Sequence, residues 1–393
     1  MRRGFRFRIY PNKQQEVLLR KSLGCVRFVW NHFLAKRQQL WTEKQESMNF
    51  YGMAKELTQM KKQPEFSWMK DVSVIALRYG MYGLEETYKK FFRGKCGFPN
   101  FKKKLGHNSM NLDTSAFSFK NGQLFIAKSK SPIKVVWHRQ LPNGCEIRNI
   151  QISLTPSGKW YVSMNAEDPS IQPLPKSDNA VGIDLGITTF ATTSNGEKIT
   201  SPNLRGEYNK LKRLQRRMSK KVKGSNNRYK ARLKVAKQYE RITNIRKDFH
   251  HKLSRQLVNE NQVICIEDLN VKGMLKNRKV SRAVSEQGWY QFRSYLQYKC
   301  DWYGRELRTI NQWYPSSKTC GSCGTHNPKV VMGVEEWTCP HCGVHHDRDL
   351  NAANNILAVG ITVSACGGSV RPKSRKGTKA TPKKQETGKS LVS

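Results

Sequence analysis

Four cysteines near the C-terminal end of the chain constrain its fold more than any other feature. They form two Cys-x2-Cys pairs, Cys320 with Cys323 and Cys339 with Cys342, and 15 residues separate the pairs. Two such knuckles can place four thiolates tetrahedrally around one Zn2+ ion, and a shell of four cysteines leaves no position for a substrate. The spacing therefore predicts one structural zinc site. Three nearby histidines are alternative ligands: His341, His345 and His346.

The composition is strongly basic. The 393 residues include 71 Lys or Arg and 29 Asp or Glu, so the formal net charge is +42. A surplus of this size repels itself in a compact chain unless a polyanion offsets it. Because 37% of the residues are hydrophobic, the charge belongs to folded domains and not only to a disordered tail. These values predict a nucleic-acid partner and disfavour a small-molecule enzyme that acts without one.

Neither end of the chain nor its interior carries a membrane signal. The N-terminus, Met1–Arg8, is basic but lacks the apolar run of a signal peptide. No window of 18 consecutive apolar residues is present. The six cysteines outside the zinc cluster are scattered, which fits a reducing compartment. We therefore expect a soluble cytoplasmic protein with no membrane partner.

Helical and strand patterns follow one another along the N-terminal half. Asn12 and Gln15 have the spacing of a capping box that opens a helix through Leu23, and apolar residues then recur at helical spacing up to Phe91, with Gly94 ending the pattern. From about Phe117 to Ala166, turn signals separate short β-prone runs. This segment predicts a small antiparallel barrel or sandwich.

A second basic segment follows the strand-rich region. Residues 205–255 hold 19 Lys or Arg against three acids, and residues 224–227 break a helical pattern. The pattern predicts a basic helical hairpin whose charge either faces solvent or tracks phosphates. The candidates for phosphate contact are Arg213, Arg216, Arg217, Lys220 and Lys221.

Three carboxylates stand where apolar residues are expected. Asp184 interrupts an otherwise apolar strand, Glu267 directly follows another apolar strand, and Asp349 lies in a segment with a helical pattern. A buried carboxylate is costly unless it is paired or bound to a cation. Three that converge would build a site for divalent metals, and two metals about 3.5–4 Å apart can hydrolyse a phosphodiester. Asp268 and Asp347 are adjacent alternatives.

Three segments resemble the split RuvC nuclease motifs of the TnpB (OrfB) family. Members of this family are insertion-sequence-encoded, RNA-guided DNA endonucleases related to the type V CRISPR effectors. The matching segments are 182–186, 266–269 and 347–353, with the four cysteines between the second and the third. Weaker matches are 8–12, 97–102, 314–319 and 366–372. No HNH-like insert separates the first two motifs, which disfavours the related IscB proteins.

The resemblance implies a fold, an activity and cofactors. The fold is α+β and multidomain: a helical recognition domain inserted in a β-barrel wedge domain, then a ribonuclease H-like RuvC domain with an inserted four-cysteine zinc module. Asp184, Glu267 and Asp349 would hold two Mg2+ ions, and Arg348 would orient a carboxylate or contact the scissile phosphate. A guide RNA would pair with the target double-stranded DNA, and the protein would recognise a short flanking motif. We expect a monomer with its RNA, acting at the prokaryotic nucleoid.

The same resemblance implies boundaries for these domains. The expected segments are a wedge domain over 1–170 with a helical insert at about 12–95, a linker at 171–178, RuvC motifs one and two with the basic hairpin over 179–312, a zinc module over 313–345, RuvC motif three over 346–366, and a disordered basic tail over 367–393.

Three other functions remain open at this stage. A guided repressor that has lost cleavage would share the fold, but it would normally lack one acid. A DNA transposase can use a similar acidic triad. A plain zinc-ribbon binder leaves the three acids unexplained. The flanking motif, the side chains that recognise it, the RNA scaffold and the cut positions do not follow from the sequence.

Overall fold

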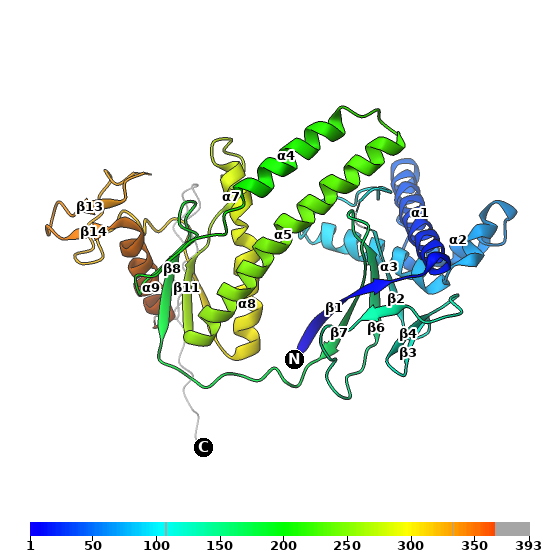
Figure 1. The fold of residues 1–393 in the computed structure, drawn as a ribbon, viewed down its shortest axis with the longest axis horizontal. Helices are drawn as coiled ribbons and strands as arrows, with labels where there is room; N and C mark the ends of the chain where they lie inside the picture. Colours follow the sequence, from blue (N-terminus) through cyan, green and yellow to red (C-terminus); the bar gives the residue numbers. More distant parts are fainter. Residues whose placement is uncertain (107, 332, 366–393) are drawn as a thin grey trace, which may run out of the picture. The chain divides into compact units, whose positions relative to one another are not determined.

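The computed structural model describes residues 1–106, 108–331 and 333–365 in two compact units. The first unit contains Met1–Lys176, Ser201–Glu260 and Gln287–Arg305. The second contains Ser177–Thr200, Asn261–Glu286 and the described residues from Glu306 onward. The expected tail, 367–393, and the 366–372 match lie outside the described residues. Each unit is described by itself (Figure 1).

An open antiparallel sheet organises the first unit. Its strand order is β2-β6-β7-β1-β5. The bounds are β1 (Arg2–Tyr10), β2 (Asn108–Asp113), β5 (Lys134–Val136), β6 (Asn149–Leu154) and β7 (Trp160–Glu167). Side chains alternate along β1, so that Phe5, Phe7 and Ile9 are buried while Arg6 and Arg8 face the other side. One face of the sheet is therefore apolar and the other is polar.

The β-barrel expected for the strand-rich segment is not found among the described residues. A barrel needs two partners for every strand, but β2 pairs only with β6, and the three-residue β5 pairs only with β1. The hairpin of β3 (Phe117–Lys120) and β4 (Gln123–Ile126) forms its own two-stranded sheet, linked to the chain before β5 by one bridge. The short edge strands leave the sheet open.

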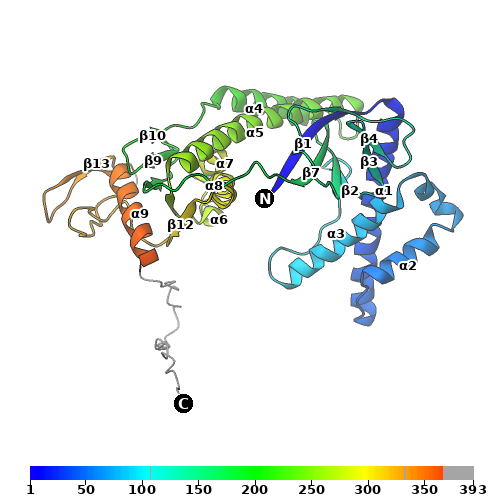
Figure 2. The same cartoon turned by 90° about the horizontal axis from the view of Figure 1, so that it is seen from below.

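Three α-helices and a 3-10 helix stand between β1 and β2 in the chain. They are α1 (Lys13–Lys44), α2 (Phe50–Met60), the 3-10 segment Pro64–Asp71 and α3 (Val74–Phe92). The predicted capping box is confirmed: the Asn12 side chain accepts from the Gln15 backbone N–H, and the Gln15 side chain accepts from the Asn12 N–H. The first helix runs past Leu23 to Lys44 without a break. Apolar residues of these helices share one core with the apolar face of the sheet (Figure 2).

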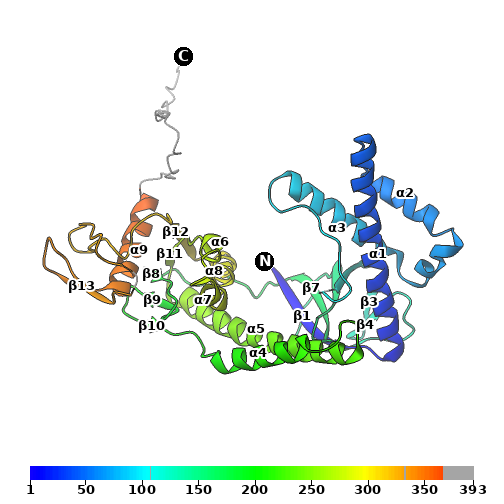
Figure 3. The same ribbon diagram turned by 90° about the horizontal axis from the view of Figure 1, so that it is seen from above.

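The basic segment forms the predicted helical hairpin. Helices α4 (Arg205–Ser219) and α5 (Asn226–Glu260) lie side by side, and α8 (Trp289–Tyr303) packs against α5 (Figure 3). Arg228 donates to the carbonyls of Met218 and Lys221 at 3.1 and 2.8 Å. These bonds close the turn between the two helices.

A mixed sheet organises the second unit, in the order β10-β9-β8-β11-β12. Strands β8, β11 and β12 are parallel, and β9 runs antiparallel to β8. The bounds are β8 (Ala180–Asp184), β9 (Ala191–Thr193), β10 (Lys198–Ile199), β11 (Val263–Glu267) and β12 (Glu306–Ile310). The smaller elements are α6 (Val271–Met274), α7 (Ser281–Gln287), β13 (Glu336–Thr338) and β14 (His345–Asp347).

Helix α9 (Arg348–Ala365) packs on this sheet at unusually short range. A Cβ at Gly182 would overlap the Ala353 carbonyl and would lie 2.7 Å from the Leu357 backbone nitrogen. A Cβ at Gly360 would lie 2.8 Å from Cys265 Cβ. One glycine on the strand and one on the helix therefore allow the backbones to approach, which sets the position of the first turn of α9.

We expect Gly182→Ala to destabilise the second unit by about 3 kcal/mol, because the added methyl group meets backbone atoms that cannot rotate away. Thermal unfolding measured by calorimetry checks this result. Gly206→Ala is the matched control: Gly206 lies in α4 with no atom within 4 Å of the added Cβ, so the change should be neutral or stabilising by roughly 0.5–1 kcal/mol. Equal melting temperatures for Gly182→Ala and the wild type would contradict the close packing.

None of the helices in the described part of the chain combines the length and the apolar character that a membrane span needs.

Candidate functional site

The three candidate carboxylates meet at one edge of the second unit. Asp184 is the last residue of β8 and Glu267 is the last residue of β11. These strands are parallel, and Ile183 pairs in register with Ile266, so the two acids follow neighbouring positions. Asp349 lies in the first turn of α9, which packs on both strands. Parallel strands deliver their carboxyl ends to the same edge of a sheet, where ligands commonly bind.

The charges of these three acids interact. Desolvation by burial and, to a smaller extent, the charges of Glu267 and Asp349 together raise the pKa of Asp184 to about 7, although the charge of Arg348 opposes them. Burial also raises the pKa of Glu267, although a hydrogen bond from the Ser316 hydroxyl favours its charged form. Like charges held together in a poorly hydrated place favour a cation.

The acids adjacent to this group have other surroundings. Asp347 caps α9: its Oδ1 accepts from the backbone N–H groups of Asp349 and Leu350 at 3.0 and 2.9 Å, and Lys198 Nζ lies 2.6 Å from its Oδ2. Asp268 is exposed. The carboxylates whose charges raise the pKa of Asp184 are those of Glu267 and Asp349.

Arg348 is engaged by one of these acids. Its Nε and Nη2 donate to Asp349 Oδ1 at 3.0 and 2.8 Å. Both bonds are to the same oxygen of Asp349, so Arg348 orients this carboxylate and leaves its Oδ2 for other ligands.

The donor set of the three acids fits Mg2+. Carboxylate oxygens are hard ligands, and Mg2+ is usually held by a few carboxylates, with water and substrate completing its shell. Among the described residues, only the four cysteines form a group of ligating atoms that all lie within 4.8 Å of one another.

The four cysteines converge as their spacing predicts. Cys320 Sγ lies 3.6 Å from Cys342 Sγ, and Cys323 Sγ lies 3.6 Å from Cys339 Sγ. Thiolates at about 2.3 Å from a tetrahedral zinc ion stand roughly 3.8 Å apart, so the cluster suggests zinc. Of the three histidines, His346 comes near, with Nε2 3.0 Å from Cys320 Sγ.

The two knuckles have the same backbone geometry. In the first, Gly324 N donates to the Cys320 carbonyl at 2.8 Å, and in the second, Gly343 N donates to the Cys339 carbonyl at 3.0 Å. Both glycines have positive φ, 74° and 71°, which side chains with a Cβ rarely adopt. Each turn places the two thiols of its knuckle close to the thiols of the other knuckle.

Hydrogen bonds attach the first knuckle to helix α9 and to Glu267. The buried side chain of Asn355 donates to the carbonyls of Ser316 and Thr319 at 2.8 and 2.7 Å. Asn351 donates to the Thr319 carbonyl at 2.8 Å and accepts from the Gly321 N–H at 2.9 Å. Because the Ser316 hydroxyl bonds Glu267, the cysteine cluster helps to position two of the three acids. Sequence reasoning missed these polar residues, although they lie inside or next to the matched motifs.

The basic candidates on the hairpin are exposed. The five residues lie at the end of α4 and in the turn that follows, and their side chains face solvent: Arg213, Arg216, Arg217, Lys220 and Lys221. No partner ion in the described structure fixes their role.

Comparison with known proteins decides the family. A protein of Streptomyces pristinaespiralis named "Putative RNA-guided DNA endonuclease" is 45% identical over 374 residues, which cover 95% of this chain and 92% of the relative. The chain belongs to the TnpB family. A second member, the "Putative RNA-guided DNA endonuclease InsQ" of Escherichia coli K12, is 31% identical, and the match covers 94% of both chains.

Family models place the TnpB match along the chain. Residues 161–278 match the OrfB "Probable transposase" model, residues 289–356 match the TNB domain of Cas12f1-like proteins, and residues 1–46 match a helix-turn-helix model. The last name does not describe this structure, because residues 1–46 form β1 followed by one uninterrupted helix. The cysteine cluster lies in the TNB region.

Solved structures share the fold of this TnpB protein. A Cas12f1 chain solved with its single guide RNA and target DNA aligns with a TM-score of 0.55 and 15% identity, covering 87% of this chain and 82% of the other. The endonuclease Cas-phi3 aligns with a TM-score of 0.50 and 9% identity over 92% of both chains. At such identities the likeness concerns the fold alone.

Proposed function

We propose that this protein is an RNA-guided DNA endonuclease that cleaves DNA next to a short flanking motif. The observation that carries the proposal is the convergence of Asp184, Glu267 and Asp349 at one edge of the second unit. The names of the TnpB relatives support the use of RNA and the DNA substrate. We further propose that the second unit is a ribonuclease H-like RuvC domain, and that the sheet and helices α1–α3 of the first unit are the wedge and recognition domains.

The residues of the site have separate tasks in this proposal. Asp184, Glu267 and Asp349 would hold two Mg2+ ions, which supply an activated water and stabilise the leaving oxygen when bound. Ser316 orients Glu267 through its hydroxyl, and Arg348 orients Asp349. The zinc ion expected at the cysteine cluster would be structural, because four thiolates complete its shell. The exposed cations of α4 would contact phosphates of the guide RNA or the heteroduplex.

Sequencing the RNA that copurifies with the full chain tests this function first. We expect one discrete RNA, and its end should differ between expression plasmids that carry different DNA next to the gene. Cleavage is then measured with that RNA, matched double-stranded DNA and Mg2+. A guide with a mismatched end and a DNA without the flanking motif are the controls. Binding of matched DNA without cleavage would support the repressor function instead, and strand-joined products would support a transposase.

A further inference from the structure

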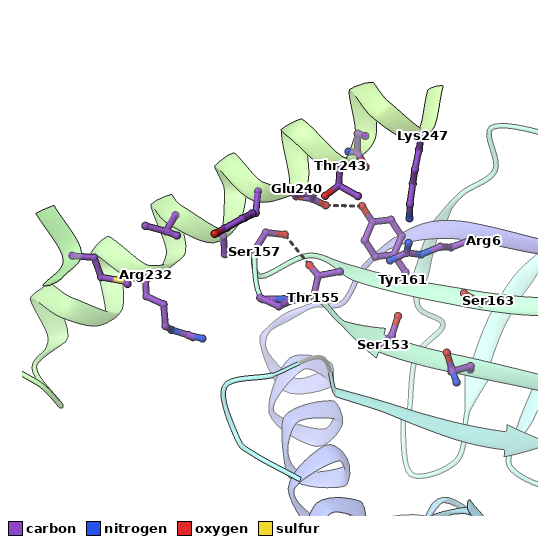
Figure 4. A pocket seen from close by; sticks show the side chains of 17 residues that line it. Arg6, Ser153, Thr155, Ser157, Tyr161, Ser163, Arg232, Glu240, Thr243 and Lys247 are labelled. Carbon is purple, nitrogen blue, oxygen red and sulfur yellow. Dashed lines mark hydrogen bonds between the residues drawn. The ribbon is translucent and has the colours of Figure 1, made fainter. Parts of the chain in front are cut away.

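A groove with mixed polar and apolar lining lies in the first unit between the sheet and the basic hairpin. Its volume is about 730 Å3. One wall is the polar face of β1, β6 and β7, and the other is helix α5 (Figure 4). The polar side chains that line this groove include those of Arg6, Ser153, Ser163, Thr243, Asn244 and Lys247.

The strand registers explain why polar groups gather on this wall. Arg6 of β1 lies opposite Ser163 of β7, and Ser153 of β6 lies opposite Tyr161 of β7. Cross-strand partners share a face, and the other face of these strands is in the core. The same alternation that buries Phe5 and Phe7 therefore presents a basic and hydroxyl-rich surface to α5.

Two cations in the groove have no counter-ion. Neither Arg6 nor Lys247 forms a hydrogen bond or an ion pair with a described residue, and Arg6 instead lies over the Tyr161 ring, 3.9 Å from its centroid. Lys247 extends from α5 toward the same ring (Figure 4). Burial lowers the pKa of Lys247, and the charges of Arg6 and Arg246 lower it further. The two cations thus repel each other in a partly desolvated place.

The one acid that lines the groove does not compensate them. Glu240 Oε2 lies 3.0 Å from Lys159 Nζ, and its Oε1 accepts from the Tyr161 hydroxyl at 3.4 Å. Lys247 is partly buried and Arg6 is exposed beside it, and a partly buried cation without a counter-ion costs free energy unless an anion joins it. Lys247 and Arg6 therefore favour an anionic ligand that the described residues do not supply.

We propose that this groove binds a single strand of the guide RNA, with one backbone phosphate between Arg6 and Lys247. The inference rests on the proposed function, because that function supplies the RNA. A volume of about 730 Å3 is in the range of small-ligand pockets and can enclose a short single-stranded segment but not a duplex. Hydroxyl and amide groups of Ser153, Ser163, Thr243 and Asn244 lie beside the two cations, and the remaining lining includes the aromatic rings of Tyr161 and Tyr239. Such groups both donate and accept, and they match the ribose 2′-hydroxyl that DNA lacks.

A pair of charge-matched double variants tests the site. Arg6→Gln with Lys247→Gln removes the two groove cations, whereas Lys234→Gln with Lys237→Gln removes two exposed cations of α5 outside the groove. Binding of the full chain to a short oligouridine and to an oligothymidine of the same length is measured across a salt series. We expect the groove variant to lose roughly tenfold in oligouridine affinity and to show a smaller salt slope. The control variant should lose roughly threefold or less.

Three outcomes decide the proposal. Equal losses for the two double variants would overturn it, and so would a wild-type protein that binds oligothymidine as tightly as oligouridine. The groove variant should melt at or above the wild-type temperature, because the repulsion between Arg6 and Lys247 is gone. That result supports the proposal and excludes misfolding as the cause of the lost binding. If the wild type copurifies with guide RNA and cleaves DNA while the two variants behave alike, only the groove assignment fails. Absence of any RNA binding by the wild type would instead refute the proposed function.

Discussion

Asp184→Asn is expected to abolish DNA cleavage and to stabilise the protein in the absence of metal. Burial and two neighbouring carboxylates raise the pKa of Asp184 to about 7. Because the pKa of this acid is higher in the folded than in the unfolded chain, its ionisation opposes folding as pH rises above the unfolded value of 3.8. At neutral pH the neutral asparagine should therefore add on the order of a few kcal/mol to the free energy of unfolding. The cleavage rate should fall by roughly 10^3-fold or more, since the acids act as a unit.

The two measurements are single-turnover cleavage with saturating guide RNA and thermal unfolding in EDTA. Asp268→Asn is the matched control, because this acid is exposed and adjoins Glu267. It should cleave at nearly the wild-type rate. Added Mg2+ should raise the melting temperature of the wild type but not that of Asp184→Asn. Cleavage by Asp184→Asn near the wild-type rate would remove Asp184 from the catalytic group.

Cys320→Ser is expected to release the metal and to reduce cleavage although all three acids remain. A structural zinc site contributes its binding free energy to folding, about 10–16 kcal/mol in small zinc domains. Its loss should disorder the first knuckle, which holds helix α9 through Asn351 and Asn355 and touches Glu267 through Ser316. Metal analysis should give about one zinc per wild-type chain and much less for the variant.

Cys96→Ser provides the control for this change, since Cys96 is exposed and lies outside the cysteine cluster. It should retain both zinc and activity. Limited proteolysis locates the effect. New proteolytic cleavage sites should appear between Glu267 and helix α9, while the first unit stays resistant to the protease. A Cys320→Ser protein that keeps a full complement of zinc would show that this thiolate is not a ligand.

Local signals in the sequence were sufficient for local features of the structure. The capping box at Asn12 needs only residues three apart. The break in the basic segment needs only a few turn-forming residues; it is predicted at 224–227, and the structure has it between Ser219 and Asn226. The cysteine knuckles are equally local, because each Cys-x2-Cys turn forms within a few residues. The barrel prediction failed because closure depends on pairing between strands far apart in sequence, which alternation alone does not specify.

The amino-acid sequence is enough to identify the chemical groups: four thiols at zinc-ligand spacing, two acids at apolar strands with a third in a helical segment, and a positive charge large enough to require a polyanionic partner. Which of these groups lie together depends on the fold. The parallel pairing of β8 with β11 sets Asp184 beside Glu267, and two glycines admit α9 closely enough to add Asp349. Only the fold attaches the cysteine cluster to that site through Asn355 and Ser316. Residue types and short spacings can be taken directly from the sequence. Contacts between residues far apart in the sequence depend on tertiary packing, which a short segment does not specify.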